Sequence, residues 1–198
     1  MLIAAFFASY LLGSFPTGFL LVKWLKRVDV RTVGSGNIGA TNVARVAGWW
    51  ASATVFFVDA VKGMLAVGLL APWFLAAPTP AERFACGVAA ILGHMFPVFL
   101  KFRGGKGVAT TVGVLLTAMP MVAFTAILTW GLCVTIWKYV SVGSLAAALV
   151  VPLLQLAERQ SRAEVLLGTA VACLIVVRHR ENLQRLRGGR EHRIGSRA

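Results

Sequence analysis

Acidic side chains are scarce in this sequence. Its 198 residues include only 7 aspartate and glutamate residues against 20 lysine and arginine residues, which gives a formal charge of +13. In the segments assigned below to the cytoplasmic side, carboxylates occur only at Asp29, Glu181 and Glu191. A magnesium or two-metal site needs several converging carboxylates, so metal-dependent phosphotransfer is disfavoured. We expect no metal and no cofactor.

Cysteine is also rare. Cys86, Cys133 and Cys173 are far apart in the sequence and lie within apolar runs. Their odd number and wide spacing predict neither a disulfide framework nor a cysteine metal cluster.

Charged residues of both signs make up only 14% of the chain, whereas hydrophobic residues make up 58%. A soluble domain is more polar than this, so the composition predicts a protein folded in a lipid bilayer. The basic residues lie beside apolar runs and glycine loops, and not along a soluble helix. We therefore expect anionic lipid headgroups or phosphorylated substrates as partners, with no nucleic acid and no obligatory protein partner.

Long apolar runs divide the chain into candidate spans, and these runs are Met1–Val22, Val46–Ala81, Phe84–Leu100, Gly107–Trp137, Tyr139–Ala157 and Val165–Val177. A helix needs about 20 apolar residues to cross a bilayer. The run from Gly107 to Trp137 is too long for one span, and Pro120 offers a break within it. The first run has no basic residues before it, so we expect an uncleaved anchor with its N-terminus outside.

The distribution of lysine and arginine decides how many spans are present. Two spans within Gly107–Trp137 place 16 of these residues inside and 3 outside, whereas one span there divides them 10 against 9. Because positive loops stay in the cytoplasm, two spans are favoured. The sequence therefore predicts an all-α, polytopic integral membrane protein with seven transmembrane helices, an external N-terminus and a cytoplasmic C-terminus. We expect a single transmembrane domain over residues 1–198.

The first cytoplasmic segment is rich in glycine and small polar residues. It reads Gly34-Ser35-Gly36-Asn37-Ile38-Gly39-Ala40-Thr41-Asn42, and Arg45 follows one turn later. Glycines let the backbone approach a ligand, the hydroxyl and amide groups form hydrogen bonds, and an arginine suits phosphate. A polar turn that caps a helix would look similar. We favour a ligand site, because a cap needs fewer polar residues.

The second cytoplasmic segment resembles a phosphate cradle. It reads Lys101-Phe102-Arg103-Gly104-Gly105-Lys106-Gly107-Val108-Ala109-Thr110 and runs directly into an apolar helix, whose N-terminus attracts anions. It lacks the spacing of a Walker A loop. A basic turn that leaves the membrane explains this segment almost as well.

Three other regions of the chain contain polar groups that membrane anchoring does not explain. In the tail, His179 and Asn182 share a helix face, and Glu191 follows; most of the neighbouring arginines need no role beyond anchoring. Within a span, Asp59 and Lys62 are one turn apart, and we favour a structural ion pair. His94 is either a ligand contact or a partner of a neighbouring helix.

Such loops offer cations and hydrogen-bond donors but few bases. They suit substrates that bring their own reactivity and need only binding, orientation and charge neutralisation. Activation of Ser35 by His179 remains open, although the spacing does not demand it. The His-x-x-x-x-Asp motif of the coenzyme-A-dependent glycerolipid acyltransferases is missing, because Phe99 stands five residues after His94.

Taken together, these segments resemble those of the bacterial acyl-phosphate:glycerol-3-phosphate acyltransferase family, PlsY. The resemblance rests on the first loop with Arg45, on 93–97 and 102–110, and on His179 and Asn182 with Arg185-Leu186 and Glu191. Asp59 with Lys62-Gly63, and Ser141 with Gly143-Ser144, also resemble family positions. The likeness covers nearly the whole chain in order. It implies a multi-pass protein of the bacterial inner membrane whose active site faces the cytoplasm.

The resemblance implies transfer of a fatty acyl group from acyl phosphate to the 1-hydroxyl of glycerol 3-phosphate, giving lysophosphatidate and phosphate. The catalytic residues expected from it are Ser35, Arg45, Lys106, His179 and Asn182. The expected substrate and phosphate contacts are Gly36, Asn37, Thr41, Asn42, Gly104, Gly105, Gly107 and Ser144. Polar residues with a structural role would be Asp59, Lys62, His94 and Glu191.

Two other classes of protein fit parts of the pattern. A phosphate or organic-anion transporter would also need glycine loops and cations, but its site lies near the membrane midplane. Only Asp59 and Lys62 are candidates at that depth. A non-catalytic lipid-binding subunit would need a basic surface but not three polar loops.

Overall fold

The computed structural model of this protein describes residues 1–195, and all regular structure in that range is helical. The chain forms two compact units, which meet in the sequence between Ala118 and Met119. The helices and helical turns of the first unit are α1 Leu2–Ser14, α2 Thr17–Lys26, η1 Val30–Thr32, α3 Ala40–Ala47, α4 Trp49–Leu65, η2 Ala66–Leu70, α5 Ala71–Phe74, α6 Pro80–Met95, η3 Val98–Leu100 and α7 Val108–Ala118. Those of the second are α8 Pro120–Trp137, α9 Val140–Ala157, α10 Arg162–Arg178 and α11 Arg180–Arg187.

Five helical stretches are long and apolar enough to cross a membrane, namely Leu2–Lys26, Trp49–Phe74, Pro80–Leu100, Pro120–Trp137 and Val140–Ala157. The two other expected spans correspond to α7, with 11 residues, and to α10, with 17. The structure thus supports an all-helical membrane protein with five full-length spans. The total of seven spans, and their orientation, stay predictions.

The apolar run from Gly107 to Trp137 breaks at Pro120, as predicted. Helix α7 ends at Ala118, and α8 begins at Pro120, so only Met119 lies between them. Proline is favoured in the first turn of a helix because its missing N–H would have no partner there. The run therefore forms two helices.

The first span contains a second break, which we did not expect. Helix α1 ends at Ser14 and α2 begins at Thr17, with Phe15 and Pro16 between them. Within a helix, proline removes a hydrogen bond and collides with the preceding turn. The break exposes the Phe15 carbonyl oxygen, which accepts a hydrogen bond from Lys62 Nζ at 2.6 Å.

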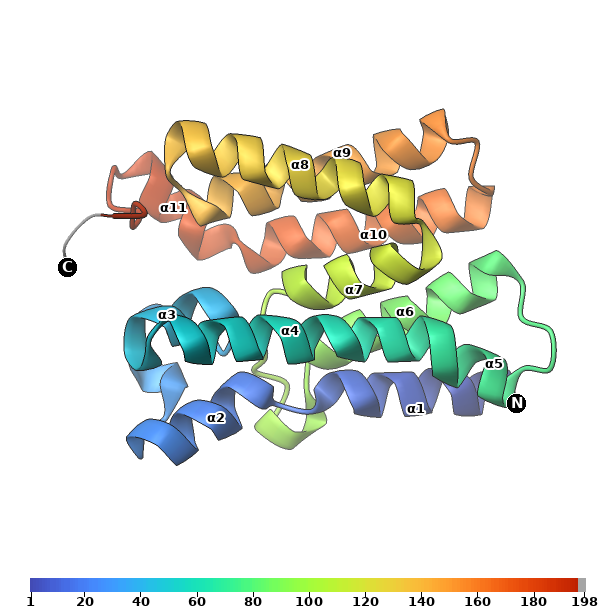
Figure 1. The fold of residues 1–198 in the computed structure, drawn as a ribbon, viewed down its shortest axis with the longest axis horizontal. Helices are drawn as coiled ribbons and strands as arrows, with labels where there is room; N and C mark the ends of the chain where they lie inside the picture. Colours follow the sequence, from blue (N-terminus) through green and yellow to red (C-terminus); the bar gives the residue numbers. More distant parts are fainter. Residues whose placement is uncertain (196–198) are drawn as a thin grey trace. The chain divides into compact units, whose positions relative to one another are not determined.

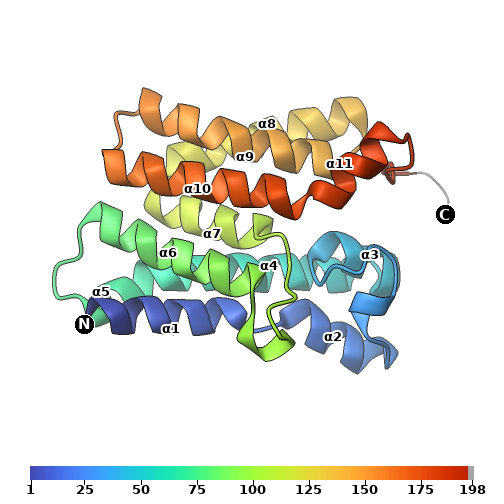
Figure 2. The ribbon, with the colours of Figure 1, turned by 180° about the vertical axis from the view of Figure 1, so that it is seen from behind.

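Glycines allow two helix pairs in the first unit to approach closely. Helix α1 packs along α6, and α4 packs along α7 (Figures 1 and 2). A Cβ on Gly13 of α1 would collide with the backbone of Ala90 in α6, and one on Gly113 of α7 would collide with the Ala60 carbonyl of α4. Small residues allow this packing in membranes, where the hydrophobic effect does not drive helices together.

In the second unit, α9 packs against both α8 and α10. Polar groups at the turn between α9 and α10 are satisfied locally. Ser161 accepts a hydrogen bond from the Glu164 N–H, and the Glu164 carboxylate accepts one from the Ser161 N–H, so the two residues form a capping box that starts α10.

Candidate functional site

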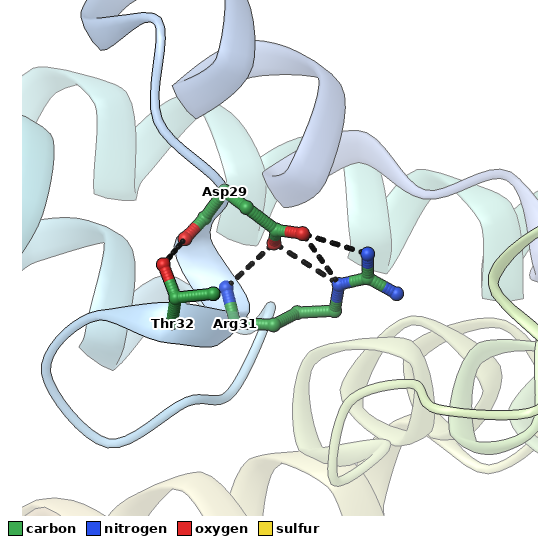
Figure 3. A network of polar contacts seen from close by, with 3 residues as sticks. All are labelled: Asp29, Arg31 and Thr32. Carbon is green, nitrogen blue, oxygen red and sulfur yellow. Dashed lines mark hydrogen bonds and ion pairs between the residues drawn. The ribbon is translucent and has the colours of Figure 1, made fainter.

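The first loop is anchored by an aspartate and an arginine just before its glycines. Asp29 Oδ1 accepts a hydrogen bond from the backbone N–H of Arg31 at 2.9 Å, and the Arg31 guanidinium binds both carboxylate oxygens, with Nη2 2.7 Å from Oδ2 (Figure 3). Thr32 Oγ1 donates to the Asp29 carbonyl. The hydrogen bond from Arg31 lowers the pKa of Asp29 below its usual value. Arg31 also lies over the ring of Phe19, 5.0 Å from its centroid, so this turn is held to α2.

The Asn42 side chain holds the rest of this loop in place by hydrogen bonds to its backbone. Its Oδ1 accepts a hydrogen bond from the backbone N–H of Ser35 at 2.8 Å. Its Nδ2 donates to the carbonyl oxygens of Val30, Val33 and Asn37 at 2.9–3.1 Å. The side chain is only 1% exposed. Because these contacts use the donors and one acceptor of the amide, Asn42 shapes the loop from within.

The position of the Asn42 side chain requires a glycine at residue 34. Its φ of 61° is in the left-handed region, and a Cβ there would collide with Asn42 Oδ1. Only glycine combines this conformation with so close an approach. The apolar support below the loop comes from a buried cluster that includes Val22, Val30, Ile38 and Val43.

The other candidates on the first loop point outward. Thr41 and Arg45 are exposed and lie one turn apart on α3, while Ser35 and Asn37 are partly exposed. The Asn37 Oδ1 accepts a hydrogen bond from the Gly39 N–H at 2.8 Å. The first loop thus presents a hydroxyl and a guanidinium on the same face of α3 and keeps Asn42 inside.

In the second loop, the glycines are buried against the end of α6. The Gly105 N–H donates to the His94 carbonyl oxygen at 3.0 Å. A Cβ on Gly104 would collide with that carbonyl, one on Gly105 with His94 Nε2, and one on Gly107 with the Met95 side chain. Gly107 also has a φ of 81°. These glycines are therefore required for packing, while Lys106 between them stays partly exposed.

The third group of candidates surrounds the junction of α10 and α11. His179 lies at that junction, 2% exposed, with Nδ1 2.8 Å from the carbonyl oxygen of Ile175. A carbonyl oxygen only accepts, so Nδ1 carries a proton in this contact.

Glu191 connects three residues of the second unit. Its Oε1 accepts hydrogen bonds from Asn182 Nδ2 at 2.6 Å and from Ser141 Oγ at 2.9 Å, and its Oε2 accepts one from Arg185 Nε at 2.8 Å. Burial raises the pKa of Glu191, but the hydrogen bonds from these three partners outweigh burial and hold it below its usual value. Ser144 lies one turn after Ser141 and donates to the Val140 carbonyl oxygen.

The structure adds two participants that the sequence analysis did not include, Arg31 and Tyr10, and it gives a partner to Ser141, a position of the family resemblance. Arg31 anchors the first loop, Ser141 binds Glu191, and Tyr10 Oη donates to the Phe96 carbonyl oxygen at 2.7 Å, beside the second loop. The Asp-x-Arg spacing is a local signal that indicates the first of these. Among residues 1–195, no three His, Cys, Asp or Glu side chains are grouped so that they could hold a metal ion.

The apolar helices and the polar loops at their ends define the class as a polytopic integral membrane protein. Comparison with known proteins gives the family. The family model described as "Glycerol-3-phosphate acyltransferase" matches residues 3–189. A glycerol-3-phosphate acyltransferase of Synechococcus elongatus is 42% identical in an alignment of 196 residues that covers 96% of this chain and 92% of the relative. One from an Anaeromyxobacter species is 45% identical in an alignment of 190 residues that covers 94% of this chain and 93% of the relative.

Solved structures agree with the sequence comparison. The crystal structure of PlsY, an integral membrane glycerol 3-phosphate acyltransferase, is similar in its glycerol 3-phosphate form with a TM-score of 0.89 at 40% identity, over 98% of this chain and 96% of that chain. The lysophosphatidic acid form gives a TM-score of 0.86 at 38% identity, over 98% and 95%. This chain belongs to the glycerol-3-phosphate acyltransferase family, of the PlsY type, and the resemblance read from the sequence is confirmed.

Proposed function

We propose that this protein transfers a fatty acyl group from acyl phosphate to the 1-hydroxyl of glycerol 3-phosphate, with lysophosphatidate and inorganic phosphate as products. Support for the acceptor and the acylated product comes from the PlsY structures, whose described forms are the glycerol 3-phosphate and lysophosphatidic acid forms. The observation that carries the choice of donor is the chemistry of the loops, which offer cations and hydrogen-bond donors with few bases.

An acyl phosphate is a mixed anhydride with a good leaving group, so its reaction needs no protein nucleophile. The glycerol hydroxyl oxygen attacks the acyl carbon, the bond from that carbon to the phosphate oxygen breaks, and inorganic phosphate leaves. A phosphate oxygen of glycerol 3-phosphate accepts the hydroxyl proton. The protein then needs only to orient the two substrates and to neutralise the developing negative charge.

We assign roles to polar residues of the two loops and of the junction between α10 and α11. Arg45 and Lys106 bind substrate phosphates, and the N-terminus of α7 directly after Gly107 favours an anion at the same place. Ser35, Asn37 and Thr41 orient the acyl phosphate. His179 and Asn182 position glycerol 3-phosphate.

The assay that tests this proposal supplies purified protein with glycerol 3-phosphate and either a long-chain acyl phosphate or the matching acyl-coenzyme A. We expect lysophosphatidate from the acyl phosphate alone. Product from acyl-coenzyme A alone would overturn the donor, and no product from either donor would favour a transporter or a lipid-binding subunit.

Variants test the assigned roles in the same assay. Arg45→Ala and Lys106→Ala should each reduce kcat/KM by about 100-fold, which is about 2.7 kcal/mol and lies within the roughly 1.5–3 kcal/mol expected of a hydrogen bond to a charged group. Unchanged kinetics in either variant would refute its role. Complete loss of turnover in His179→Ala, with both substrates still bound and the fold intact, would make His179 the base in place of the substrate phosphate.

We also propose that these loops face the cytoplasm of a bacterial inner membrane. The support is the charge distribution, in which the loops and the tail contain most of the lysine and arginine residues. Glycerol 3-phosphate and acyl phosphate would then reach the loops from the cytoplasm and from the bilayer.

A further inference from the structure

Three titratable side chains lie buried together in the first unit, away from the roles assigned above. Asp59 and Lys62 come from α4, His94 comes from the last turn of α6, and they are 2%, 3% and 5% exposed. Lys62 Nζ is 2.5 Å from Asp59 Oδ1, and His94 Nδ1 is 3.7 Å from the same oxygen. Charged groups within a membrane span are costly, so their presence there calls for a function.

Lys62 connects this group to the break in the first span. Its Nζ donates to the Phe15 carbonyl oxygen at 2.6 Å and lies 6.0 Å from the centroid of the Phe15 ring. The Phe15 carbonyl oxygen lies in the break, where it also accepts a hydrogen bond from the Thr17 N–H at 3.1 Å. The ammonium group therefore joins α4 to the gap between α1 and α2.

His94 connects the group to the second loop by two contacts. Its carbonyl oxygen accepts a hydrogen bond from the Gly105 N–H at 3.0 Å. Its imidazole lies so close to Gly105 that a Cβ there would collide with Nε2. The position of the imidazole thus limits where the backbone of Gly105, and with it the next residue Lys106, can lie.

We propose that Asp59, Lys62 and His94 are positioning residues for the Gly104–Gly107 loop. The Asp59 carboxylate lies beside the imidazole, with Oδ1 3.7 Å from Nδ1, Lys62 balances that carboxylate and ties it to the α1–α2 break, and His94 supports Gly105. The charged pair within the span therefore acts through the loop and touches no substrate. This inference deepens the proposed function and rests on it, because Lys106 is assigned there to a substrate phosphate, which this inference takes to be the phosphate of glycerol 3-phosphate.

One test uses the contact between His94 and Gly105. Gly105→Ala alone forces the loop away from the imidazole, and His94→Ala alone removes its support, so each should weaken glycerol 3-phosphate binding by about tenfold or more, as a small misplacement does. In the double variant the added methyl occupies space left by the imidazole, so binding should be tighter than in either single variant. Losses that simply multiply in the double variant would overturn the proposal. Gly131→Ala is the matched control, since a Cβ there meets nothing within 4 Å.

A second test removes the charges of the pair while keeping its volume. A single change leaves an uncompensated charge and destabilises the fold, whereas Asp59→Asn with Lys62→Met leaves a neutral pair that should preserve the Tm. If the pair serves stability alone, this double variant keeps wild-type kinetics, and that result would overturn the proposal. We expect a near wild-type Tm with a KM for glycerol 3-phosphate raised about tenfold and a smaller change in kcat.

Binding of glycerol 3-phosphate, measured by calorimetry for each variant, separates this inference from the proposed donor. A wild-type protein that binds glycerol 3-phosphate but uses acyl-coenzyme A contradicts the donor alone, and the variants still report on the loop. Wild-type affinity in the Asp59→Asn/Lys62→Met protein overturns the positioning role whatever the donor is. Absence of glycerol 3-phosphate binding by the wild type overturns both.

Discussion

At the residue scale, the structure changes the role expected of Asn42 more than that of any other candidate discussed above. In the sequence it is one of several amides in a polar loop, and we expected it to contact substrate. In the structure its Nδ2 and Oδ1 bind four backbone groups of the loop, and the side chain is buried. Its effect on catalysis would therefore pass through the backbone of Ser35.

Asn42→Asp should reduce kcat/KM by more than tenfold. The substitution keeps the size and the acceptor for the Ser35 N–H, but it turns an oxygen toward three carbonyl oxygens, and each lost buried hydrogen bond costs about 1–3 kcal/mol. Steady-state kinetics with varied acyl donor measure the effect. Thr32→Ala, which loses the bond from Thr32 Oγ1 to the Asp29 carbonyl oxygen in the same loop, is the control and should be milder. Equal losses in the two variants would contradict a central role for Asn42.

Glu191 predicts a pH dependence of stability. Its pKa is held below the usual 4.5 in the folded protein. The resulting stabilisation is therefore fully present above the usual value, and it is lost as the pH falls through the lower pKa of the folded state. Compared with Glu191→Gln, the wild type should be more stable by about 1 kcal/mol at pH 7, and the difference should shrink below about pH 4.5. Thermal unfolding of both proteins in detergent from pH 3 to pH 7 measures it, and a difference independent of pH would contradict this origin.

At the element scale, the close helix pairs depend on glycines that have no role in chemistry. Gly113 of α7 leaves no room for a Cβ beside the Ala60 carbonyl of α4, whereas Gly131 of α8 has open space. The second loop is the connection between α6 and α7. Packing of α7 on α4 therefore contributes to where that loop begins and ends.

Gly113→Ala should destabilise the protein by about 1–3 kcal/mol, because the added methyl group must push α7 away from α4. Gly131→Ala should change stability by less than about 1 kcal/mol, within the range of helix propensity. The Tm values of the two variants in the same detergent provide the comparison. A similar Tm for both variants would show that α7 can move away from α4 at little cost in free energy.

At the scale of the whole molecule, the orientation in the membrane is the main property that follows from charge alone. A fluorescent reporter fused after residue 198 should be active in the cytoplasm, because the tail after α10 is rich in arginine. Fusion after Ala157, at the end of α9, should instead place the reporter outside. Fluorescence of the second fusion and not the first would reverse the topology.

Properties that depend on consecutive residues could be predicted from the sequence. Apolar length indicated membrane helices, Pro120 indicated the break before α8, and the order of motifs identified the family. Pro16 offered the same local signal, but the apolar run around it is long enough for one span, and we did not predict the break. The shortness of α7 follows from the break at Pro120, because its 11 residues lie between the second loop and Met119.

Other properties depend on partners that are distant along the chain, and only the tertiary structure decides these. Lys62 binds the carbonyl of Phe15, 47 positions away, and Ser141 binds Glu191, 50 positions away. The sequence by itself determined that the protein folds in a lipid bilayer, which family it belongs to and where its polar loops lie. Apolar length, charge and motif order are all properties of consecutive residues. The folded protein decided which of those polar groups face inward, because a hydrogen bond or a close contact exists only once helices have brought its two atoms together.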